Sequence, residues 1–114
     1  MKFIIAIIQP GKLDAVKDAL MNVEVVRLTV VDCQGFGRTR GHQPSYVPQD
    51  RSLQLLRKVQ LQIAVNDPFV EPTIRAIRSS ACEGDGQLGD GKIFVLPMDD
   101  CIRIRTGERG DEAI

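Results

Sequence analysis

The sequence predicts an α+β domain in which four antiparallel strands form one sheet and two helices cover one face of it. Short β-branched segments alternate with segments of helical periodicity, so that two strand-helix-strand units follow each other along the chain. A long stretch rich in glycine and proline separates the two units. The length of 114 residues is that of one domain, and we therefore expect a single domain over residues 1–114.

The first unit is predicted as strand, helix, strand. Residues 2–8 are apolar and β-branched and end before a Pro-Gly pair, which is typical of a buried strand. Residues 11–22 repeat apolar side chains at helical spacing and predict one amphipathic helix. Residues 23–34 are β-branched again and predict a second strand, buried on much of both faces.

The second unit repeats this order and adds a short strand. Residues 58–65 place large apolar side chains at every second position, against Lys58, Gln60 and Gln62, which predicts a strand. Residues 69–81 predict a helix that starts near its first residue, because a proline three positions later is tolerated only in the first turn. Residues 92–97 predict a fourth strand and residues 101–107 a short alternating one, whereas residues 108–114 look loosely held.

This order matches the ferredoxin-like βαββαβ arrangement, with a long loop between the halves and a short C-terminal strand. The loop covers about residues 37–55, and a structureless stretch of that length inside a domain usually carries function. One face of the sheet has no helix to cover it and includes apolar residues. We therefore expect the chain to oligomerise through that face.

Composition limits the function classes. Lys and Arg together number 15, as do Asp and Glu, so no overall field attracts nucleic acid or an anionic membrane and any anion site must be local. The three cysteines form no CxxC pair, which argues against a disulfide framework and a thiolate zinc site. The sequence shows no signal peptide and no apolar run of ~20 residues, so we expect a cytoplasmic protein without direct membrane insertion.

A local anion site is predicted at Gly89–Lys92. Successive glycine amides can curl around a phosphate, and Lys92 adds a positive charge directly after them. Arg103 and Arg105 lie two positions apart on the predicted short strand, where both guanidinium groups would face the same side. The other interpretation is a connecting turn followed by a solvated strand edge, and these residues alone leave both open.

Four stretches resemble, in order and across almost the whole chain, signature blocks of the P-II nitrogen-regulatory signal proteins: "MKFIIAIIQPGKLDAVKDAL", "GFGRTRGH", "LRKVQLQIAV" and "GDGKIFVLPMDDCIRIRTGERG". The resemblance implies a non-enzymatic homotrimer of ferredoxin-like subunits that binds ATP or ADP in each of three clefts between neighbours. It also implies 2-oxoglutarate beside Mg-ATP. The long loop, called the T-loop in this family, would present the result to an ammonium transporter, a glutamine-synthetase-related enzyme or a transcription regulator.

The resemblance also assigns residues, position by position. It implies that one subunit cradles the phosphates with Gly89, Asp90, Gly91 and Lys92, while its neighbour contributes Arg103 and Arg105. Lys58 matches the lysine that pairs with a 2-oxoglutarate carboxylate. The further positions that line the nucleotide in the family correspond to Ile7, Thr29, Gly35, Gly37, Arg38 and Ala64.

Three positions depart from the family pattern. Thr39 stands where the family has a glutamine that helps to hold Mg, and since a threonine hydroxyl reaches less far, we expect weak or absent 2-oxoglutarate binding. Arg51 replaces the tyrosine that many relatives have uridylylated, so this modification is not expected at that site. Gln87 stands where a lysine often lies, which predicts that nucleotide binding persists but is weaker or has an altered preference between ATP and ADP.

Other function classes fit these residues less well. A phosphate-transfer enzyme on the same fold needs a fixed nucleophilic group, but the only histidine, His42, lies in the long loop. An RNA-binding sheet needs exposed aromatic side chains on two central strands, and the chain has no Trp and one Tyr. A metal sensor lacks a cluster of ligands. An adenylate-only energy sensor that regulates a transporter remains an alternative.

Overall fold

The structure of the protein is a computed structural model that describes residues 1–36 and 55–114. The expectations for Gly37, Arg38, Thr39 and Arg51, and almost all of the predicted T-loop, lie outside the described residues. The described elements follow the predicted βαββαβ order: β1 (Lys2–Ile8), α1 (Leu13–Asn22), β2 (Thr29–Gly35), β3 (Leu56–Val65), α2 (Val70–Ala81) and β4 (Gly91–Pro97).

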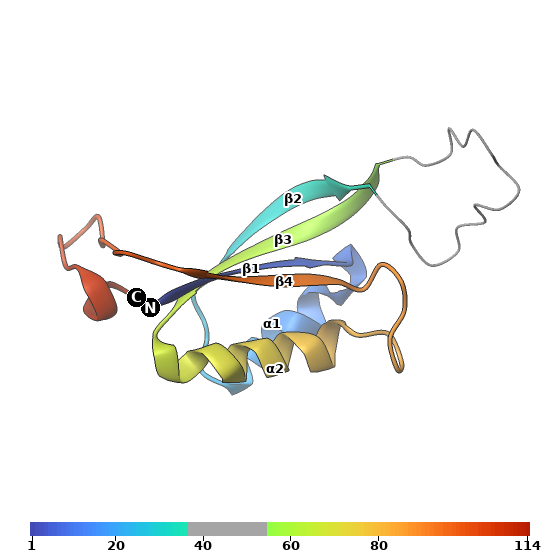
Figure 1. The fold of residues 1–114 in the computed structure, drawn as a ribbon, viewed down its shortest axis with the longest axis horizontal. Coiled ribbons are helices and arrows are strands. Elements are labelled where there is room, and N and C mark those ends of the chain that lie inside the picture. Colours follow the sequence, from blue (N-terminus) through green and yellow to red (C-terminus); the bar gives the residue numbers. More distant parts are fainter. Residues whose placement is uncertain (37–54) are drawn as a thin grey trace, which may run out of the picture.

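The four strands form one antiparallel sheet in the order β2-β3-β1-β4. The two central strands, β1 and β3, come from different halves of the chain and therefore join the two units. Both helices lie on the same side of the sheet (Figure 1). This arrangement confirms the predicted ferredoxin-like fold.

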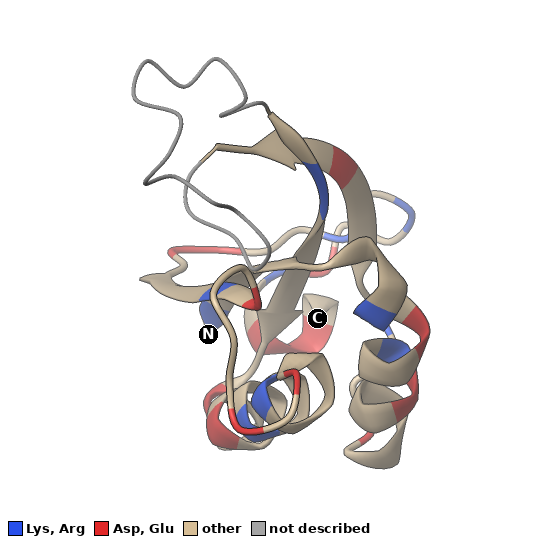
Figure 2. Cartoon of the chain, turned by 90° about the vertical axis from the view of Figure 1, so that its right-hand side faces the viewer, with Lys and Arg blue, Asp and Glu red and all other residues tan. Residues whose placement is uncertain are grey.

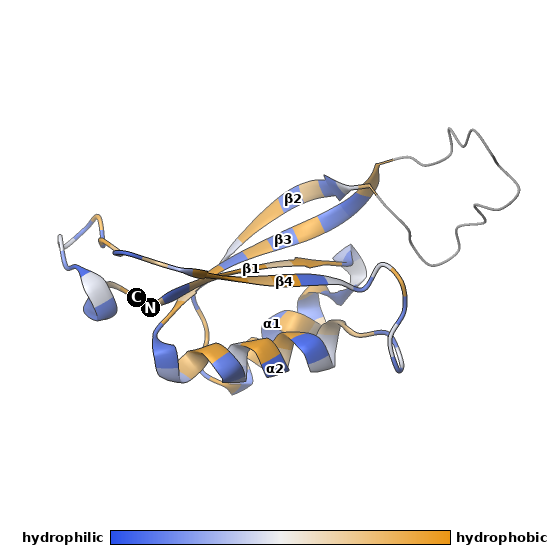
Figure 3. Ribbon diagram, viewed as in Figure 1, coloured by the Kyte–Doolittle hydropathy of each residue, from blue (hydrophilic) through white to orange (hydrophobic). Residues whose placement is uncertain are grey.

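The core lies between the sheet and the helices. Ile4, Ala6 and Ile8 of β1 are at most 1% exposed and face α1 and α2, as do the alternate apolar residues of β3. The alternation of apolar and polar residues along β3 is visible in Figure 3. Each fully buried Leu or Ile contributes roughly 1.5–3 kcal/mol of hydrophobic free energy. The face of the sheet that carries these apolar side chains is therefore the face that the helices cover.

Each helix is preceded by a short 3-10 turn that starts at or includes a proline, Pro10–Lys12 before α1 and Asp67–Phe69 before α2. The start of α2 at Val70 agrees with the predicted start within one residue, and Pro72 lies in the first turn, as expected. The Thr73 hydroxyl donates a 2.7 Å hydrogen bond to the Phe69 carbonyl, which satisfies a fully buried polar group.

The prediction of a strand over residues 23–34 is wrong in its first half, because β2 begins only at Thr29. The expected burial on both faces is also wrong for the single chain, because the residues of β2 are exposed or half-buried. The preceding backbone instead turns back on the end of α1: the Val25 amide donates to the Leu20 carbonyl at 2.9 Å. Glu24 takes a positive φ of 65° at this turn. Val25 is buried beside the helix, so its β-branched side chain is accommodated without a strand.

The prediction of a strand over residues 101–107 is also wrong. The segment forms a tight turn in which the Arg103 amide donates to the Glu108 carbonyl at 2.9 Å and the Gly107 amide to the Arg103 carbonyl at 2.7 Å. A single antiparallel bridge joins Ile102 to Arg109. Gly107 has a φ of 75°, which a glycine adopts without strain and which ends any extended run.

The C-terminal segment is held against the domain, contrary to the expectation that it is loose. Residues Gly110–Ala113 form a 3-10 turn, and the Gly110 amide donates to the Cys101 carbonyl at 2.9 Å. Asn66 and Arg27 contact the main chain of Asp111 and Ile114 at 3.3 and 3.4 Å. These contacts fix the turn at residues 103–108 relative to the rest of the chain.

Both acidic and basic residues lie on the surface of each helix (Figure 2), in agreement with the zero net charge. No helix in the described part of the chain is both long and apolar enough to cross a membrane.

Candidate functional site

A cavity of about 510 Å³ lies at one end of the sheet, where the glycine-rich loop enters β4. It collects the end of β1, the end of β2, the beginning of β3 and the loop itself. Its lining residues are Ile7, Gly35, Phe36, Lys58, Gln87, Leu88, Gly89, Asp90, Gly91, Lys92 and Phe94. The structure thus brings together seven residues that the sequence predicted for the site: Ile7, Gly35, Lys58, Gly89, Asp90, Gly91 and Lys92.

Gly91 allows the loop to pass directly against β1. Its φ is 117°, a backbone conformation that side chains oppose, and a Cβ atom placed there would lie 1.7 Å from the Ile7 carbonyl oxygen. No other residue type fits this contact. This close approach fixes the point at which the loop ends and β4 begins.

The loop is tied to the sheet through the Gly89 carbonyl. This oxygen accepts a hydrogen bond from the Lys58 ammonium at 2.9 Å and another from the Gln9 side-chain amide at 2.8 Å. Lys58 is only 8% exposed, and its stem packs against Gly35. A Cβ atom on residue 35 would lie 3.2 Å from the Lys58 Cγ, so the missing side chain of Gly35 makes room for the lysine. The lysine expected to hold a 2-oxoglutarate carboxylate therefore also braces the glycine-rich loop.

Asp90 shapes the loop from inside. Its Oδ2 atom accepts hydrogen bonds from the main-chain amides of Gln87 at 2.8 Å and Glu83 at 3.2 Å. The Gln87 bond is the main cause that lowers the pKa of the Asp90 carboxyl, so the group stays ionised in the loop. Glu83 is in turn paired with Lys12 at 3.2 Å, which links the loop to the start of α1.

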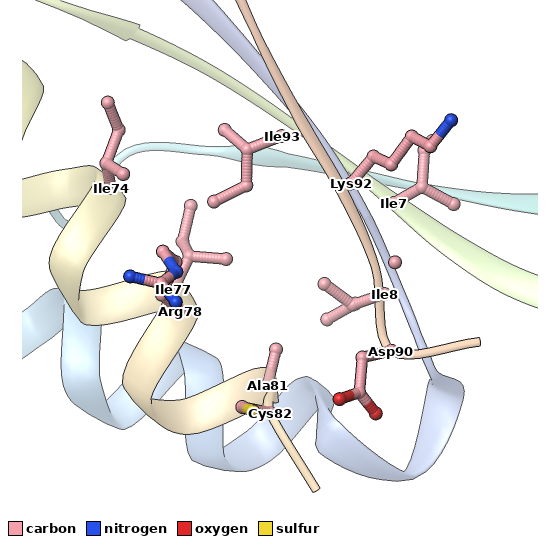
Figure 4. Close-up of a pocket in the computed structure, with 11 residues that line it drawn as sticks. Ile7, Ile8, Ile74, Ile77, Arg78, Ala81, Cys82, Asp90, Lys92 and Ile93 are labelled. Atoms are coloured by element: carbon pink, nitrogen blue, oxygen red, sulfur yellow. The ribbon is translucent and has the colours of Figure 1, made fainter. Parts of the chain in front are cut away.

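Lys92 is exposed and, within residues 1–36 and 55–114, forms no ion pair. Its Cα lies opposite Ile7 in the register of β1 and β4. Figure 4 shows Lys92 and Ile7 on one side of the strands, whereas Ile93 and Ile77 point into the space on the helix side. The Lys92 ammonium is therefore available to a ligand on the open face of the sheet.

A second cavity, of about 300 Å³, lies on that helix side between α2 and β4 (Figure 4). Its wall is mostly aliphatic, with Ile74, Ile77, Ile93 and Ala81 among the lining residues. Polyanions are not expected there, because apolar walls do not replace the water around charged oxygens. The larger cavity is the better candidate for the predicted ligand.

The remaining described residues of the predicted site lie toward the other end of the sheet. Ala64 is the register partner of Phe3, and Arg103 and Arg105 belong to the turn that follows β4. From Lys92 to the end of β4 at Pro97 the strand spans roughly 17 Å. Figure 1 shows the glycine-rich loop and the C-terminal turn at opposite ends of the sheet. One chain therefore does not bring Lys92 and these arginines to the same phosphate.

The two arginines also differ from each other. Because their segment is a turn, the strand alternation that would place both on one face is absent. Arg103 is paired with Glu108 at 2.8 Å, whereas Arg105 is exposed and has no ion-pair partner in the described part of the chain.

Thr29, another residue of the predicted site, is the first residue of β2 and the register partner of Gln62.

Sequence reasoning missed several residues of the site. Gln9 donates to the Gly89 carbonyl, and Phe36, Leu88 and Phe94 line the cavity. A polar residue directly after a strand that ends at the same edge of the sheet was the signal for Gln9. Among the residues that the structure describes, no group of three His, Cys, Asp or Glu is placed to hold a metal ion.

Comparisons with known proteins agree with this geometry. A family model described as nitrogen regulatory protein P-II matches residues 1–108. The chain is 51% identical over 114 residues to nitrogen regulatory protein GlnK1 of Methanosarcina mazei, covering 100% of this chain and 97% of that protein. It is 46% identical to nitrogen regulatory protein P-II of Azospirillum brasilense, with 100% of both chains covered.

A solved structure of Arabidopsis thaliana PII bound to citrate has the same fold, with a TM-score of 0.81 and 36% sequence identity over 99% of this chain and 91% of that one. Fold, motif blocks and sequence identity therefore point to one family. The chain belongs to the nitrogen regulatory protein P-II family, whose members are non-enzymatic signal-transduction regulators of nitrogen metabolism.

Proposed function

We propose that this protein binds ATP or ADP in the clefts between the subunits of a homotrimer and controls partner proteins through its T-loop, about residues 37–55. One observation carries the proposal: the cavity of about 510 Å³ collects Gly89–Lys92, Ile7 and Gly35, while Arg103 and Arg105 belong to the turn that follows the far end of β4. A ligand with several negative charges would use both sets only where two chains meet.

The glycine-rich loop suits phosphate groups because it is shaped before a ligand arrives. Lys58 and Gln9 hold the Gly89 carbonyl, and Asp90 holds the main chain of the loop from the other side. A fixed turn loses little freedom on binding. Main-chain amides and the Lys92 ammonium would then contact phosphate oxygens, while Asp90 contributes by shaping the turn and not by touching the anion.

Assembly through the open face of the sheet supports a shared cleft. This face carries exposed apolar side chains, including Val31, Phe94 and Leu96, which are 37%, 46% and 40% exposed. A second and third copy of the chain would remove these side chains from water. A cleft between copies also encloses a nucleotide from two sides, so Thr29, Ala64, Arg103 and Arg105 would face the ligand from the neighbouring chain.

Carboxylate effectors would meet Lys58. Its ammonium has three N–H donors and gives one to the Gly89 carbonyl, so others remain for a carboxylate. The similarity to a PII chain bound to citrate supports a capacity for small organic acids. We expect 2-oxoglutarate to bind weakly or not at all because of Thr39. Magnesium would arrive with the nucleotide phosphates, which supply the hard oxygen ligands that it prefers.

Calorimetric titration with ATP and with ADP, each with and without Mg and 2-oxoglutarate, tests the proposal. The unmodified protein should bind nucleotide, and Lys92→Ala should lose most of that affinity. Lys17→Ala is the matched control, because Lys17 is an exposed lysine on α1 whose ion-pair partner among the described residues is Asp14. Absence of nucleotide binding by the unmodified protein would refute the proposal. A submicromolar 2-oxoglutarate affinity with Mg-ATP present would refute the expected weakness and the adenylate-only alternative.

The output is proposed to be protein binding by the T-loop, with an ammonium transporter, a glutamine-synthetase-related enzyme or a transcription regulator as the partner. Replacing residues 42–50 by a glycine-serine linker of the same length should leave nucleotide affinity unchanged and abolish partner binding. Retained partner binding by this variant would show that partners bind to another surface of the protein.

A further inference from the structure

The turn after β4 is built around one carboxylate, that of Glu108. Its Oε1 atom accepts hydrogen bonds from Arg103 Nη1 at 2.8 Å and from the Thr106 hydroxyl at 2.8 Å. The Thr106 hydroxyl oxygen also accepts a 3.2 Å hydrogen bond from the Glu108 amide. Glu108 is therefore fixed by its own main chain and by its neighbour in the turn.

Arg103 is held at a second point. Its Nη2 atom donates to the Glu112 main-chain carbonyl at 3.2 Å. A guanidinium group has five N–H donors in a planar fork, so two engaged donors orient the plane and leave three for a ligand. Arg105, on the same turn, has no such contacts in the described part of the chain.

Fold stability alone does not account for this arrangement. The Arg103 and Glu108 side chains are 29% and 39% exposed, and ion pairs with that much contact with water contribute little to folding. Orientation matters more. An unrestrained arginine samples many rotamers, and fixing one of them when a ligand binds would weaken binding. An arginine already fixed by Glu108 avoids most of this loss.

We propose that Glu108 is a positioning residue: it holds the Arg103 guanidinium in the orientation that receives the phosphate groups bound by a neighbouring chain. This inference rests on the proposed nucleotide binding at subunit clefts. It assigns different roles to the two arginines, because Arg103 is placed in advance and Arg105 is ordered only when the ligand binds. Glu108 itself does not touch the ligand.

A double-mutant cycle read by calorimetry with ATP tests this inference. Glu108→Ala should weaken ATP binding about tenfold, whereas in an Arg103→Ala background it should change the affinity by less than about twofold. Glu108→Gln should stay within about threefold of the unmodified protein, because its amide oxygen still accepts from Arg103. Glu112→Gln is the control, because it removes the same charge as Glu108→Ala. Arg103 donates to the main-chain carbonyl of Glu112, so this contact is kept in the variant.

Three results would overturn the inference: unchanged or tighter binding by Glu108→Ala, an equal loss in both backgrounds, or a loss by Glu108→Gln as large as that by Glu108→Ala. If Glu108→Ala does not fold, Thr106→Val replaces it in the cycle, because it removes the hydroxyl that anchors Glu108. If the effect of Thr106→Val on ATP affinity depends on Arg103, the inference is supported; if the effect is independent of Arg103, the inference is overturned. If the unmodified protein binds no nucleotide, the proposed function itself fails, which is a separate result.

Discussion

The Lys58 ammonium donates a hydrogen bond to the Gly89 carbonyl at 2.9 Å and so joins β3 to the glycine-rich loop. Gln9, at the end of β1, donates to the same oxygen at 2.8 Å. The position of the loop therefore depends on the register of two central strands. It also depends on Lys58, the residue that the family resemblance links to a carboxylate ligand, so a ligand at Lys58 would act directly on the glycine-rich loop.

Replacing Lys58 by methionine keeps most of the buried stem and removes the donor. We expect Lys58→Met to weaken ATP binding by roughly three- to tenfold, since the Gly89 carbonyl loses a charge-assisted hydrogen bond. Lys17→Met on the exposed face of α1 is the matched control. Calorimetry measures both, and equal affinity of the two variants would show that the brace does not matter for binding.

Replacing Gly91 should disrupt the pairing of β1 with β4. A Cβ at this position meets the Ile7 carbonyl at 1.7 Å on a backbone with a φ of 117°, so Gly91→Ala should destabilise the protein by roughly 2–3 kcal/mol or more. Gly11→Ala is the control, because a Cβ there meets nothing within 4 Å. Chemical denaturation gives both free energies of unfolding, and similar values would contradict the observed close approach.

Acid should loosen the glycine-rich loop through Asp90. Its pKa is lowered, chiefly by the hydrogen bond from the Gln87 amide, so its contribution is complete above the usual carboxyl pKa of about 4 and is lost as the pH falls through the lowered value. Hydrogen exchange at the Gln87 amide should therefore accelerate below about pH 4, after correction for the intrinsic rate.

Asp90→Asn should remove this pH dependence, because the amide oxygen accepts at every pH. Asp14→Asn is the control, since the Asp14 side chain is 94% exposed on α1. A pH profile that Asp90→Asn leaves unchanged would show that another group controls the loop.

The fold could be predicted where the signal is local. The apolar residues at every second position of 58–65 and the helical spacing of residues 69–81 each predict one element, because burial on one face requires that period. The strand predictions for residues 23–28 and 101–107 are wrong because they rely on β-branched and alternating side chains alone. The main-chain hydrogen bonds of these residues go instead to the end of α1 and across a turn closed at Gly107, and composition does not show such partners.

The candidate site divides in the same way. The block Gly89–Lys92 is contiguous, so the sequence could predict that these residues lie together in one loop. The contact of Gln9 with Gly89 depends on how β1 ends relative to the loop, which only the sheet register determines. The separation of Lys92 from Arg105 likewise follows from the direction of β4 and not from the spacing of the residues.

The proposed assembly can be tested at Leu96, which is 40% exposed on the open face of the sheet. Leu96→Asp should shift the protein from trimer to monomer, because a carboxylate buried between copies would lose its water without gaining a partner. Met21→Asp is the control, since Met21 is 61% exposed on α1. Analytical ultracentrifugation reports the mass of each, and a trimeric Leu96→Asp variant would place the interface elsewhere.

The central claim is that Lys92 of one chain and Arg105 of its neighbour complete one nucleotide site, and co-assembly of two defective variants tests it most directly. Lys92→Ala and Arg105→Ala should each bind ATP poorly alone. Every mixed trimer should contain one interface with both residues intact, so co-expressed chains should recover tight ATP binding at that interface. Lys92→Ala co-expressed with Lys92→Gln is the control and should recover none. Failure of the first mixture to bind ATP more tightly than either variant alone would contradict the shared site.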